Sequence, residues 1–373
     1  MALSTIQNNS FADTAVHGFR NLIINGAMQI YQRGAGTLAS GQFGPDRFEW
    51  GTANLDNLAG TLTQDSDAPD NFSSSLKITV TTAETSIASD EYAYLHQRIE
   101  AQNLQGLGYG TSSAKQVTLS FWVKSSVTGT FAVGLYKGDN TVQIHNKTYT
   151  INSAGTWEYK TVTFSANTLS GGAIDNDSGI GLYVSWHLGA GSTYKGTSSS
   201  SGWISYVSSS WADGQDTDAV LTTTNATWQI TGVQLEVGSE PTPFEHRSYA
   251  DELFRCERYL QQWGVKGSDN HAYAMWVYVS NNVSNFINLK QQMRTVPTIT
   301  IFGSPVNTSA GSVGPNTWAI YQDATWRGCN LINTAGASAG GFRLNTRSND
   351  SISIGACGLY GGVNCYLELD AEL

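Results

Sequence analysis

Short runs in which apolar and polar residues alternate recur along the chain, and each run predicts a half-buried β-strand. Gly, Asn, Asp and Ser residues separate the runs, as is typical of the turns between strands. Many short strands at near-regular spacing favour a β-sandwich or jelly roll over alternating strands and helices. In the first part of the chain the runs are residues 76–82, 92–99, 117–124, 131–137, 157–165, 180–188 and 227–236. The Ser-rich tract 191–210 predicts a surface loop around a short strand at 203–207.

The strand at 227–236 contains one irregularity in its alternation. Trp228 and Ile230 are in phase with each other, whereas Val233 and Leu235 follow after a slip at Thr231-Gly232. A glycine at such a slip predicts a β-bulge.

A helical pattern replaces the alternation at residues 247–263. Ser248 is the expected N-cap, and Asp251 and Glu252 suit the first turn of a helix. Apolar residues at heptad-like 4-3-4-3 spacing form a stripe along this helix, which predicts either an oligomer seam or a helix that lies against its own sheet. The stripe consists of Tyr249, Leu253, Cys256, Leu260 and Trp263.

The strand pattern returns after Gly264 and predicts a second β domain of ordinary size. Its runs are residues 271–279, 284–289, 298–302, 317–321, 342–347, 351–356 and 364–369. We therefore predict an all-β protein with an N-terminal arm (1–20), a jelly-roll β-sandwich (21–246), a short connecting helix (247–264) and a second, C-terminal β-sandwich domain (265–373).

Several segments of the sequence carry a resemblance to a known class of proteins. The segment TWQITGVQLEVGSEPTPFEHRSYADELFRCERYLQQ, residues 227–262, resembles the end of the jelly-roll module of tail-fibre and other surface proteins of tailed bacteriophages. RNLIINGAMQIYQRG, residues 20–34, and PDRFEW, residues 45–50, resemble the start of the same module. INLKQQMRTVPTITIF, residues 287–302, and the ending CYLELDAEL resemble the domains that follow it.

Composition and charge narrow the class of partners. Thirty acidic and twenty basic residues give a formal charge of -10, so there is no basic footprint for nucleic acid. No apolar run approaches the ~18 residues of a membrane span, and the N-terminus does not resemble a signal peptide. We expect a protein made in the host cytoplasm that does not insert into a membrane.

Strand phase predicts which side chains point away from the core. On the four strands 92–99, 117–124, 131–137 and 180–188, the outward positions mix aromatic with hydrogen-bonding residues, as saccharide recognition requires. The jelly-roll module also resembles carbohydrate-binding modules, whose concave sheet supplies such residues. An alternative is that these positions pack on an extra strand, a subunit partner or the second domain. The candidates for glycan binding are Tyr92, Tyr94, His96, Arg98, Trp122, Tyr136, Tyr183 and His187.

Other sites have little support in the sequence. Trp157 and Trp228 each open a strand and are expected to anchor the sandwich, whereas Trp203 and Trp211 fit either an exposed loop tip or a buried one. Four scattered cysteines show no zinc-type spacing and are expected to be buried thiols. The acidic residues Asp213, Asp216 and Asp218 hint at calcium, but their segment lacks the glycine at the sixth position and the terminal Glu of an EF-hand loop. No nucleophile or paired-carboxylate motif is present, so we expect no catalytic site, metal or cofactor.

The resemblance implies a structural protein of a tailed-phage virion. It would be held to other virion proteins by its N-terminal arm and would form a homo-oligomer, most simply a homotrimer. The leading hypothesis is a tail fibre or spike that binds host-surface glycans. A head decoration or collar component, whose β domains only pack on other virion proteins, is the alternative, and a glycan depolymerase is a third.

Overall fold

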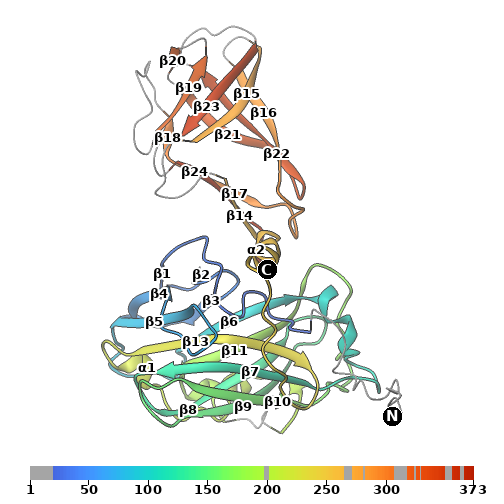
Figure 1. Ribbon diagram of the computed structural model, residues 1–373. Coiled ribbons are helices and arrows are strands. Elements are labelled where there is room, and N and C mark those ends of the chain that lie inside the picture. The colour runs from blue at the N-terminus through green and yellow to red at the C-terminus, as the bar shows by residue number, and fades with distance from the viewer. Residues whose placement is uncertain are drawn as a thin grey trace, which may run out of the picture. The chain divides into compact units, whose positions relative to one another are not determined.

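A computed structural model describes residues 20–196, 201–263, 271–279, 282–305, 317–322, 325–327, 329–348, 355–361 and 365–373 (Figure 1). The predicted N-terminal arm therefore lies outside the described residues except for Arg20. The chain divides into two compact units. One runs to Glu252 and includes Leu373, and the other spans Leu253–Glu372.

The N-terminal unit contains two antiparallel sheets, which we call the first and the second sheet. The first sheet has six strands in the order β1-β4-β5-β13-β7-β10. They are β1 (Gly36–Thr37), β4 (Ala59–Asp65), β5 (Ser75–Thr82), β13 (Thr227–Val237), β7 (Val117–Ser125) and β10 (Glu158–Phe164).

The second sheet has seven strands in the order β12-β9-β8-β11-β6-β3-β2. They are β12 (Ile204–Ser205), β9 (Gln143–Ile151), β8 (Gly129–Lys137), β11 (Ile180–Ala190), β6 (Tyr92–Glu100), β3 (Glu49–Ala53) and β2 (Gln42–Phe43). Short helices lie in the connections: η2 (Ala101–Leu107), η3 (Ser192–Tyr194), η4 (Ser208–Ser210) and α1 (Ala219–Thr222).

The core lies between these two sheets and consists of the residues that strand phase assigns to it. Leu119, Phe121 and Val123 of the first sheet are fully buried, and so is Trp186 of the second. The rings of Phe121 and Trp186 meet edge to face with centroids 5.8 Å apart, so side chains of the two sheets interlock. The predicted in-and-out phase of these strands is confirmed.

The predicted bulge in β13 is also confirmed. The register between β13 and β7 shifts between Thr231 and Gln234. Gly232 within this shift has φ 61°, a conformation that favours glycine.

The two segments that resemble the start and the end of one module lie side by side. The Leu22 amide donates to the Leu235 carbonyl at 2.9 Å, and Asn21 Nδ2 donates to the Val233 carbonyl at 3.0 Å. Arg247 Nη1 donates to the Ile23 carbonyl at 3.0 Å, and the Arg247 side chain is only 6% exposed. A buried arginine therefore joins the two ends of the sandwich.

Of the two tryptophans predicted to anchor the sandwich, only Trp228 does so, because it is fully buried in β13. Trp157 is half-buried and precedes β10 by one residue. Its Nε1 donates to Asp67 Oδ1 at 3.1 Å on the outer side of the first sheet. The expectation for Trp157 was wrong.

The C-terminal unit is also built from β-strands. Trp318 of its eight-stranded sheet and Leu367 and Leu369 of its three-stranded sheet belong to one buried core. The three-stranded sheet has the order β14-β24-β17, with β14 (Leu260–Trp263), β24 (Tyr366–Asp370) and β17 (Thr298–Phe302). The other sheet comprises β15 (His271–Val279), β16 (Asn282–Asn288), β18 (Ser304–Pro305), β19 (Thr317–Gln322), β20 (Thr325–Arg327), β21 (Cys329–Ser338), β22 (Gly341–Ser348) and β23 (Gly355–Gly361).

The predicted connecting helix is correct at its start and wrong at its end. α2 spans Tyr249–Glu257, and Ser248 Oγ accepts the Asp251 amide at 3.1 Å, as an N-cap does. Residues 260–263 are instead strand β14, which pairs with Leu367–Asp370 of β24. The β24 partner lies a hundred residues away in sequence, so the local pattern could not reveal it.

The predicted helical seam is therefore wrong as well. Leu260 and Trp263 lie on a strand, and Cys256 and Leu260 are already fully buried within this chain. Tyr249 is 59% exposed. Among the described residues, no helix has both the length and the apolar character needed to cross a membrane.

Candidate functional site

Seven of the eight predicted glycan-binding residues lie on the outer side of the second sheet. They come from the neighbouring strands β6, β11 and β8. The register pairs Tyr183 with both Arg98 and Tyr136 and pairs His187 with Tyr94. The exception is Trp122, which lies on β7 of the first sheet, so grouping it with the others was wrong. The order of strands in a sheet depends on tertiary pairing, and the alternation of residues along one strand does not reveal which strands pair.

Aromatic side chains from the loop after β11 complete this surface. Trp211 contacts Tyr94, Tyr136 and His187 with ring centroids 5.1, 5.4 and 5.0 Å apart, each nearly edge to face. We call the whole set the tyrosine face. It consists of Tyr92, Tyr94, Tyr136 and Tyr183 from the sheet and Tyr194, Tyr206 and Trp211 from the loop.

The loop is fastened to the sheet by hydrogen bonds, and Trp211 is only 8% exposed. Asn146 Nδ2 on β9 donates to the Trp211 carbonyl at 2.9 Å and also to the Ser210 carbonyl. The Ala212 amide donates to the Tyr194 carbonyl at 2.9 Å. Of the two options for Trp203 and Trp211, the buried one is correct, and the chain itself covers part of the predicted face.

A set of polar side chains lies beneath the rings. We call it the polar layer: His96, Asn146, Ser185 and His187, each at most 1% exposed. The two histidines lie on the outer side of the sheet, as predicted, but they are buried because the rings of the tyrosine face close over them. Both ring nitrogens of His187, Nδ1 of His96, Oγ of Ser185 and Oδ1 of Asn146 have no hydrogen-bond partner within the described residues. Such atoms are costly in a dry interior, so this layer is suited to water or to the hydroxyls of a ligand.

Two glycines make room for this arrangement. Gly134 is paired with Asn146, and a Cβ on Gly134 would lie 1.8 Å from Asn146 Oδ1. A Cβ on Gly51 would lie 2.4 Å from Cζ of Tyr94. The absence of these side chains lets Asn146 and Tyr94 lie flat across the neighbouring strand.

A charged group borders the polar layer. Glu49 Oε2 on β3 lies 3.4 Å from His96 Nε2 and 3.0 Å from Arg98 Nη1. The Arg98 guanidinium also lies 5.4 Å from the centre of the Tyr183 ring. Burial opposes ionisation of Glu49, yet His96 and the charges of Arg98 and Arg47 hold its pKa below the usual range. The negative charge of Glu49 and the positive charge of Arg98 therefore offset each other at this edge. Arg98 presents a donor beside the Tyr183 ring.

Burial and, to a smaller extent, the nearby His96 lower the pKa of His187 to about 3; burial also lowers the pKa of His96 itself. A histidine that is neutral in the folded state binds a proton more readily in the unfolded chain, because its pKa is higher there. We therefore expect stability to be full above pH ~6.5 and to fall as the pH drops toward 3.

Between pH ~6.5 and ~5, above the range of carboxyl groups, His187 should account for a loss of about 2 kcal/mol. Urea unfolding of wild type and His187→Gln across this range tests the assignment. The variant should show a smaller pH slope, since His96 and His145, whose pKa burial also lowers, remain. An unchanged slope in His187→Gln would contradict it.

The carboxylates of the acidic segment 213–218 bond to separate protein groups in and near the loop and do not converge on one ligand. Asp216 Oδ1 accepts the Thr130 amide at 2.7 Å, whereas Asp218 pairs with Lys195 at 3.0 Å. In the part of the chain that the structure describes, no three His, Cys, Asp or Glu side chains are grouped to hold a metal ion.

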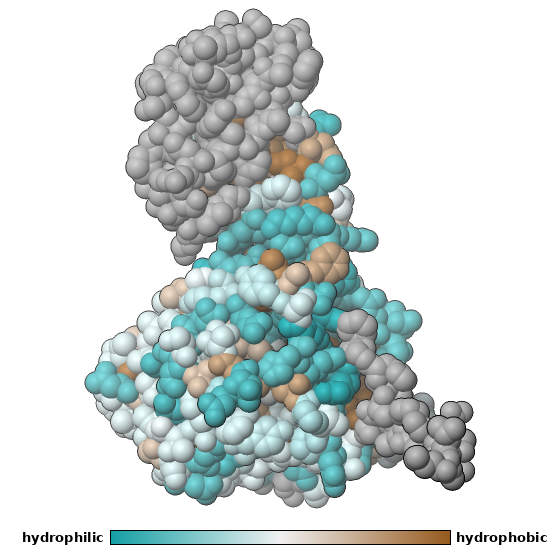
Figure 2. Space-filling model, viewed as in Figure 1, coloured by the Kyte–Doolittle hydropathy of each residue, from teal (hydrophilic) through white to brown (hydrophobic). Residues whose placement is uncertain are grey.

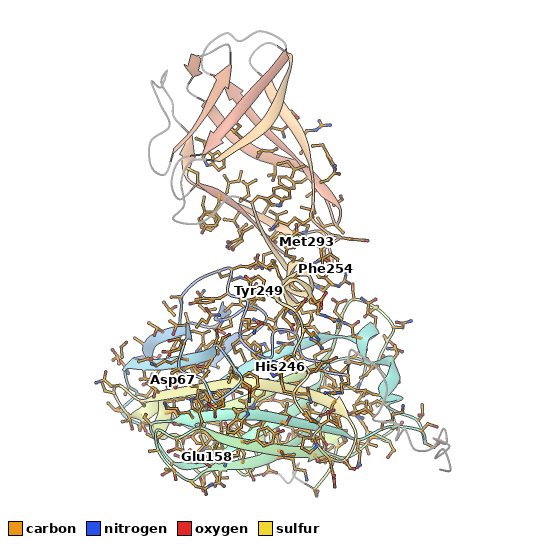
Figure 3. All side chains as sticks on the ribbon, in the orientation of Figure 1. Asp67, Glu158, His246, Tyr249, Phe254 and Met293 are labelled. Atoms are coloured by element: carbon orange, nitrogen blue, oxygen red, sulfur yellow. The ribbon has the colours of Figure 1, made fainter. Side chains whose placement is uncertain are left out.

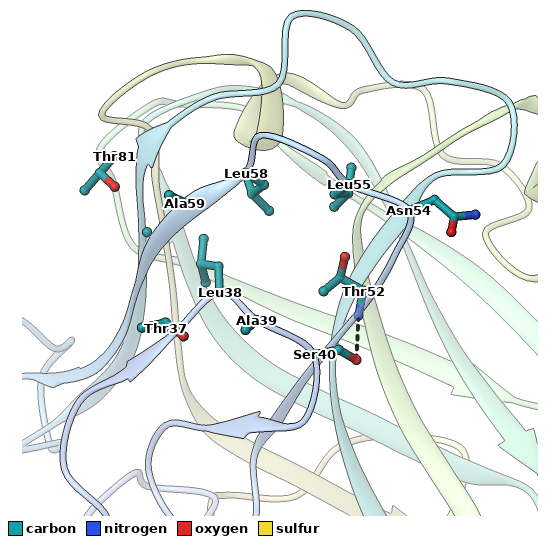
Figure 4. A pocket seen from close by; sticks show the side chains of 11 residues that line it. Thr37, Leu38, Ala39, Ser40, Thr52, Asn54, Leu55, Leu58, Ala59 and Thr81 are labelled. Carbon is teal, nitrogen blue, oxygen red and sulfur yellow. Dashed lines mark hydrogen bonds between the residues drawn. The ribbon is translucent and has the colours of Figure 1, made fainter.

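A pocket of about 500 Å³ lies elsewhere in the N-terminal unit, near the edge formed by β1, β3 and β4 (Figure 4). Leu38, Leu55 and Leu58 line it together with the hydroxyl side chains of Thr37 and Thr52. None of its lining residues is aromatic or charged. It therefore lacks the ring surfaces that distinguish the tyrosine face.

Comparison with known proteins yields similarities to solved structures only. No family model and no curated protein matches the sequence. The enzymatically active domain of bacteriophage CBA120 tailspike protein 4 is 12% identical, with 59% of this chain and 22% of that chain covered and a TM-score of 0.32. The match thus spans about a fifth of the length of that tailspike chain.

Two further similar structures are described as sugar-binding proteins. A putative sugar binding protein from Bacteroides thetaiotaomicron is 14% identical, covering 58% of this chain and 100% of its own, with a TM-score of 0.34. A family 11 carbohydrate-binding module from Clostridium thermocellum, in complex with a β-1,3-1,4-mixed-linked tetrasaccharide, is 9% identical, covering 56% and 98%, with a TM-score of 0.28. Similarity this low carries no argument about function, and the all-β fold rests on the strand pairing described above.

Proposed function

We propose that this protein is a non-enzymatic glycan-binding component of a tailed-phage virion that attaches to host-surface saccharides through the tyrosine face. One observation carries the binding proposal: aromatic rings gather over a layer of buried polar atoms that have no hydrogen-bond partner among the described residues. The virion origin is supported by the resemblance of residues 20–34, 45–50 and 227–262 to the jelly-roll module of phage surface proteins.

The chemistry of this face fits a pyranose ring. Tyr92, Tyr136 and Tyr183 are half-buried, so each leaves part of its side chain open to solvent. The apolar C–H side of a sugar stacks on such a ring, while the phenol hydroxyl and the Arg98 guanidinium bond to sugar hydroxyls. A hydroxyl that enters between the rings would meet the unpartnered atoms of Ser185 and His187.

A glycan array with wild type and a Tyr136→Ala/Tyr183→Ala double variant tests the proposal. Removing a central aromatic contact costs about 2 kcal/mol, so the variant should lose roughly thirtyfold or more in affinity. Tyr249→Ala is the matched control, because Tyr249 is 59% exposed on α2 and lies outside the face. Equal binding by wild type and the double variant would refute the proposed face. Shorter saccharides released from the array would favour the depolymerase hypothesis instead.

The oligomeric state stays a prediction. The helical seam no longer supports a homotrimer, and what remains is the aromatic surface and the resemblance to fibre and spike proteins. Mass measurement at micromolar concentration decides between a trimer and a monomer that docks on a larger assembly. A monomer in that measurement would remove the trimer while leaving glycan binding untouched.

A further inference from the structure

Aromatic side chains also gather on the outer side of the first sheet, opposite the tyrosine face. Tyr159 on β10 is paired with Trp122 on β7, and their ring centroids are 5.3 Å apart. Tyr159 is 45% exposed, and Trp122 and Trp157 are half-buried. We call these three residues the tryptophan platform. Asp67 and His246, labelled in Figure 3, lie on the same side of the unit, where Figure 2 shows hydrophobic side chains among hydrophilic ones.

Polar contacts hold the platform in place. Asp67 accepts Trp157 Nε1 at 3.1 Å through one carboxylate oxygen and Lys124 Nζ at 2.6 Å through the other. Lys124 Nζ also lies 6.0 Å from the centre of the Trp157 ring. Lys124 holds the pKa of Asp67 below its usual range. The tryptophan is therefore oriented by a carboxylate that stays ionised and still has acceptor capacity.

The bulge in β13 extends the aromatic surface. A Cβ on Gly232 would lie 2.7 Å from Cζ of Phe72 and 3.0 Å from Cδ1 of Trp122, so both rings lie over this glycine. The Phe72 ring in turn meets that of Phe244 at 5.0 Å. The bulge thus places rings from distant segments beside the platform.

The side chains around the platform favour a saccharide over a protein partner. The outward positions of β7 and β10 carry hydroxyl, charged and aromatic residues and no aliphatic one: Thr118, Ser120, Trp122, Lys124, Tyr159, Thr161 and Thr163. Cores of protein interfaces are more apolar than this. Aromatic rings next to hydroxyls match the C–H and O–H groups of a sugar.

The charges and the ring geometry define the saccharide further. Lys124 is paired with Asp67 at 2.6 Å and Lys77 with Asp65 at 2.9 Å, so these charges of the surface offset each other. The planes of Trp122 and Tyr159 are inclined by 51°, so two sugars stacked on them would be rotated relative to one another. We propose that the tryptophan platform is a second saccharide site, which takes a neutral oligosaccharide as a single twisted chain.

This inference takes its ligand class from the proposed function but uses different residues. The two sites lie on the outer sides of opposite sheets, so one N-terminal unit would engage two saccharide chains at once.

Array and calorimetric titrations of the full chain with neutral oligosaccharides of glucose, galactose, mannose and xylose test the second site. Tyr136→Ala/Tyr183→Ala should lose the binding at the tyrosine face and retain only the binding that goes through the platform. Adding Tyr159→Ala to that variant should remove it by roughly thirtyfold or more, whereas Tyr159→Phe should preserve it. Tyr159 is 45% exposed, so its truncation should leave the unfolding midpoint unchanged, which thermal unfolding checks.

The outcomes separate the two sites. If wild type binds no saccharide, the proposed function fails together with the second site. If Tyr136→Ala/Tyr183→Ala loses all binding, only the second site is overturned. Affinity of the platform should change less than twofold between about 50 mM and 500 mM NaCl, because no net charge is engaged. A steep loss with salt, or selective binding of polygalacturonate, would overturn the neutral ligand.

Discussion

Replacing Arg247 with alanine should lower the free energy of unfolding of the N-terminal unit by about 3–5 kcal/mol. The guanidinium lies 3.2 Å from Glu245 and 3.4 Å from Glu252 and donates to the Ile23 carbonyl. Without it, two largely buried carboxylates would lose their cation, and the two ends of the sandwich would lose a shared donor. Urea unfolding followed by tryptophan fluorescence measures the change.

Two further variants make the Arg247 prediction specific. Arg247→Lys keeps the charge but not the planar fork, so it should recover only part of the stability. Lys195→Ala breaks the ion pair between Lys195 and Asp218, in which the two side chains are 24% and 26% exposed. It should lower the free energy of unfolding by no more than about 1 kcal/mol. Equal losses for Arg247→Ala and Lys195→Ala would contradict the role assigned to Arg247.

Asn146→Ala should destabilise the same unit by about 2–4 kcal/mol and weaken saccharide binding as well. Asn146 is fully buried and donates to the carbonyls of Ser210 and Trp211, both of which would lose this donor. Trp211 would then no longer be held against Tyr94 and His187. Urea unfolding and the glycan array measure the two effects.

Thr148→Ala is the matched control for Asn146→Ala. It changes the same strand, β9, two residues further on, where the side chain is exposed. It should leave both stability and binding nearly unchanged. An Asn146→Ala variant that is less stable yet binds saccharide normally would show that Trp211 has no part in the site.

The strands that could be predicted are those whose inward positions are large and apolar. The run Leu119, Phe121 and Val123 gave β7 its position and its phase. Strand β9, Gln143–Ile151, was missed because the inward positions of its first half, Gln143, His145 and Lys147, are polar. The end of α2 was misplaced because Leu260 fits the apolar stripe of a helix as well as it fits strand β14, which forms by pairing with β24.

The candidate site was predictable only in part for a related reason. Phase along β6, β8 and β11 identifies Tyr94, Tyr136 and Tyr183 correctly as outward residues. It does not show that a loop returns with Trp211 over them and buries His187, since that contact joins distant segments. Two signals were present in the sequence: Gly134 within a strand, which marks a close approach, and a Trp at the end of a Ser-rich loop.

The indole N–H resonance of Trp211 reports directly on saccharide binding at the tyrosine face. Trp211 Nε1 is buried and has no hydrogen-bond partner among the described residues, so a hydroxyl that reaches it should shift this resonance. A titration with an oligosaccharide that binds on the array should shift the Trp211 signal saturably, with the same affinity as calorimetry, and leave that of the core residue Trp228 in place. Saturable binding that leaves the Trp211 signal unmoved, or wild type that binds no saccharide, would contradict saccharide binding at the tyrosine face.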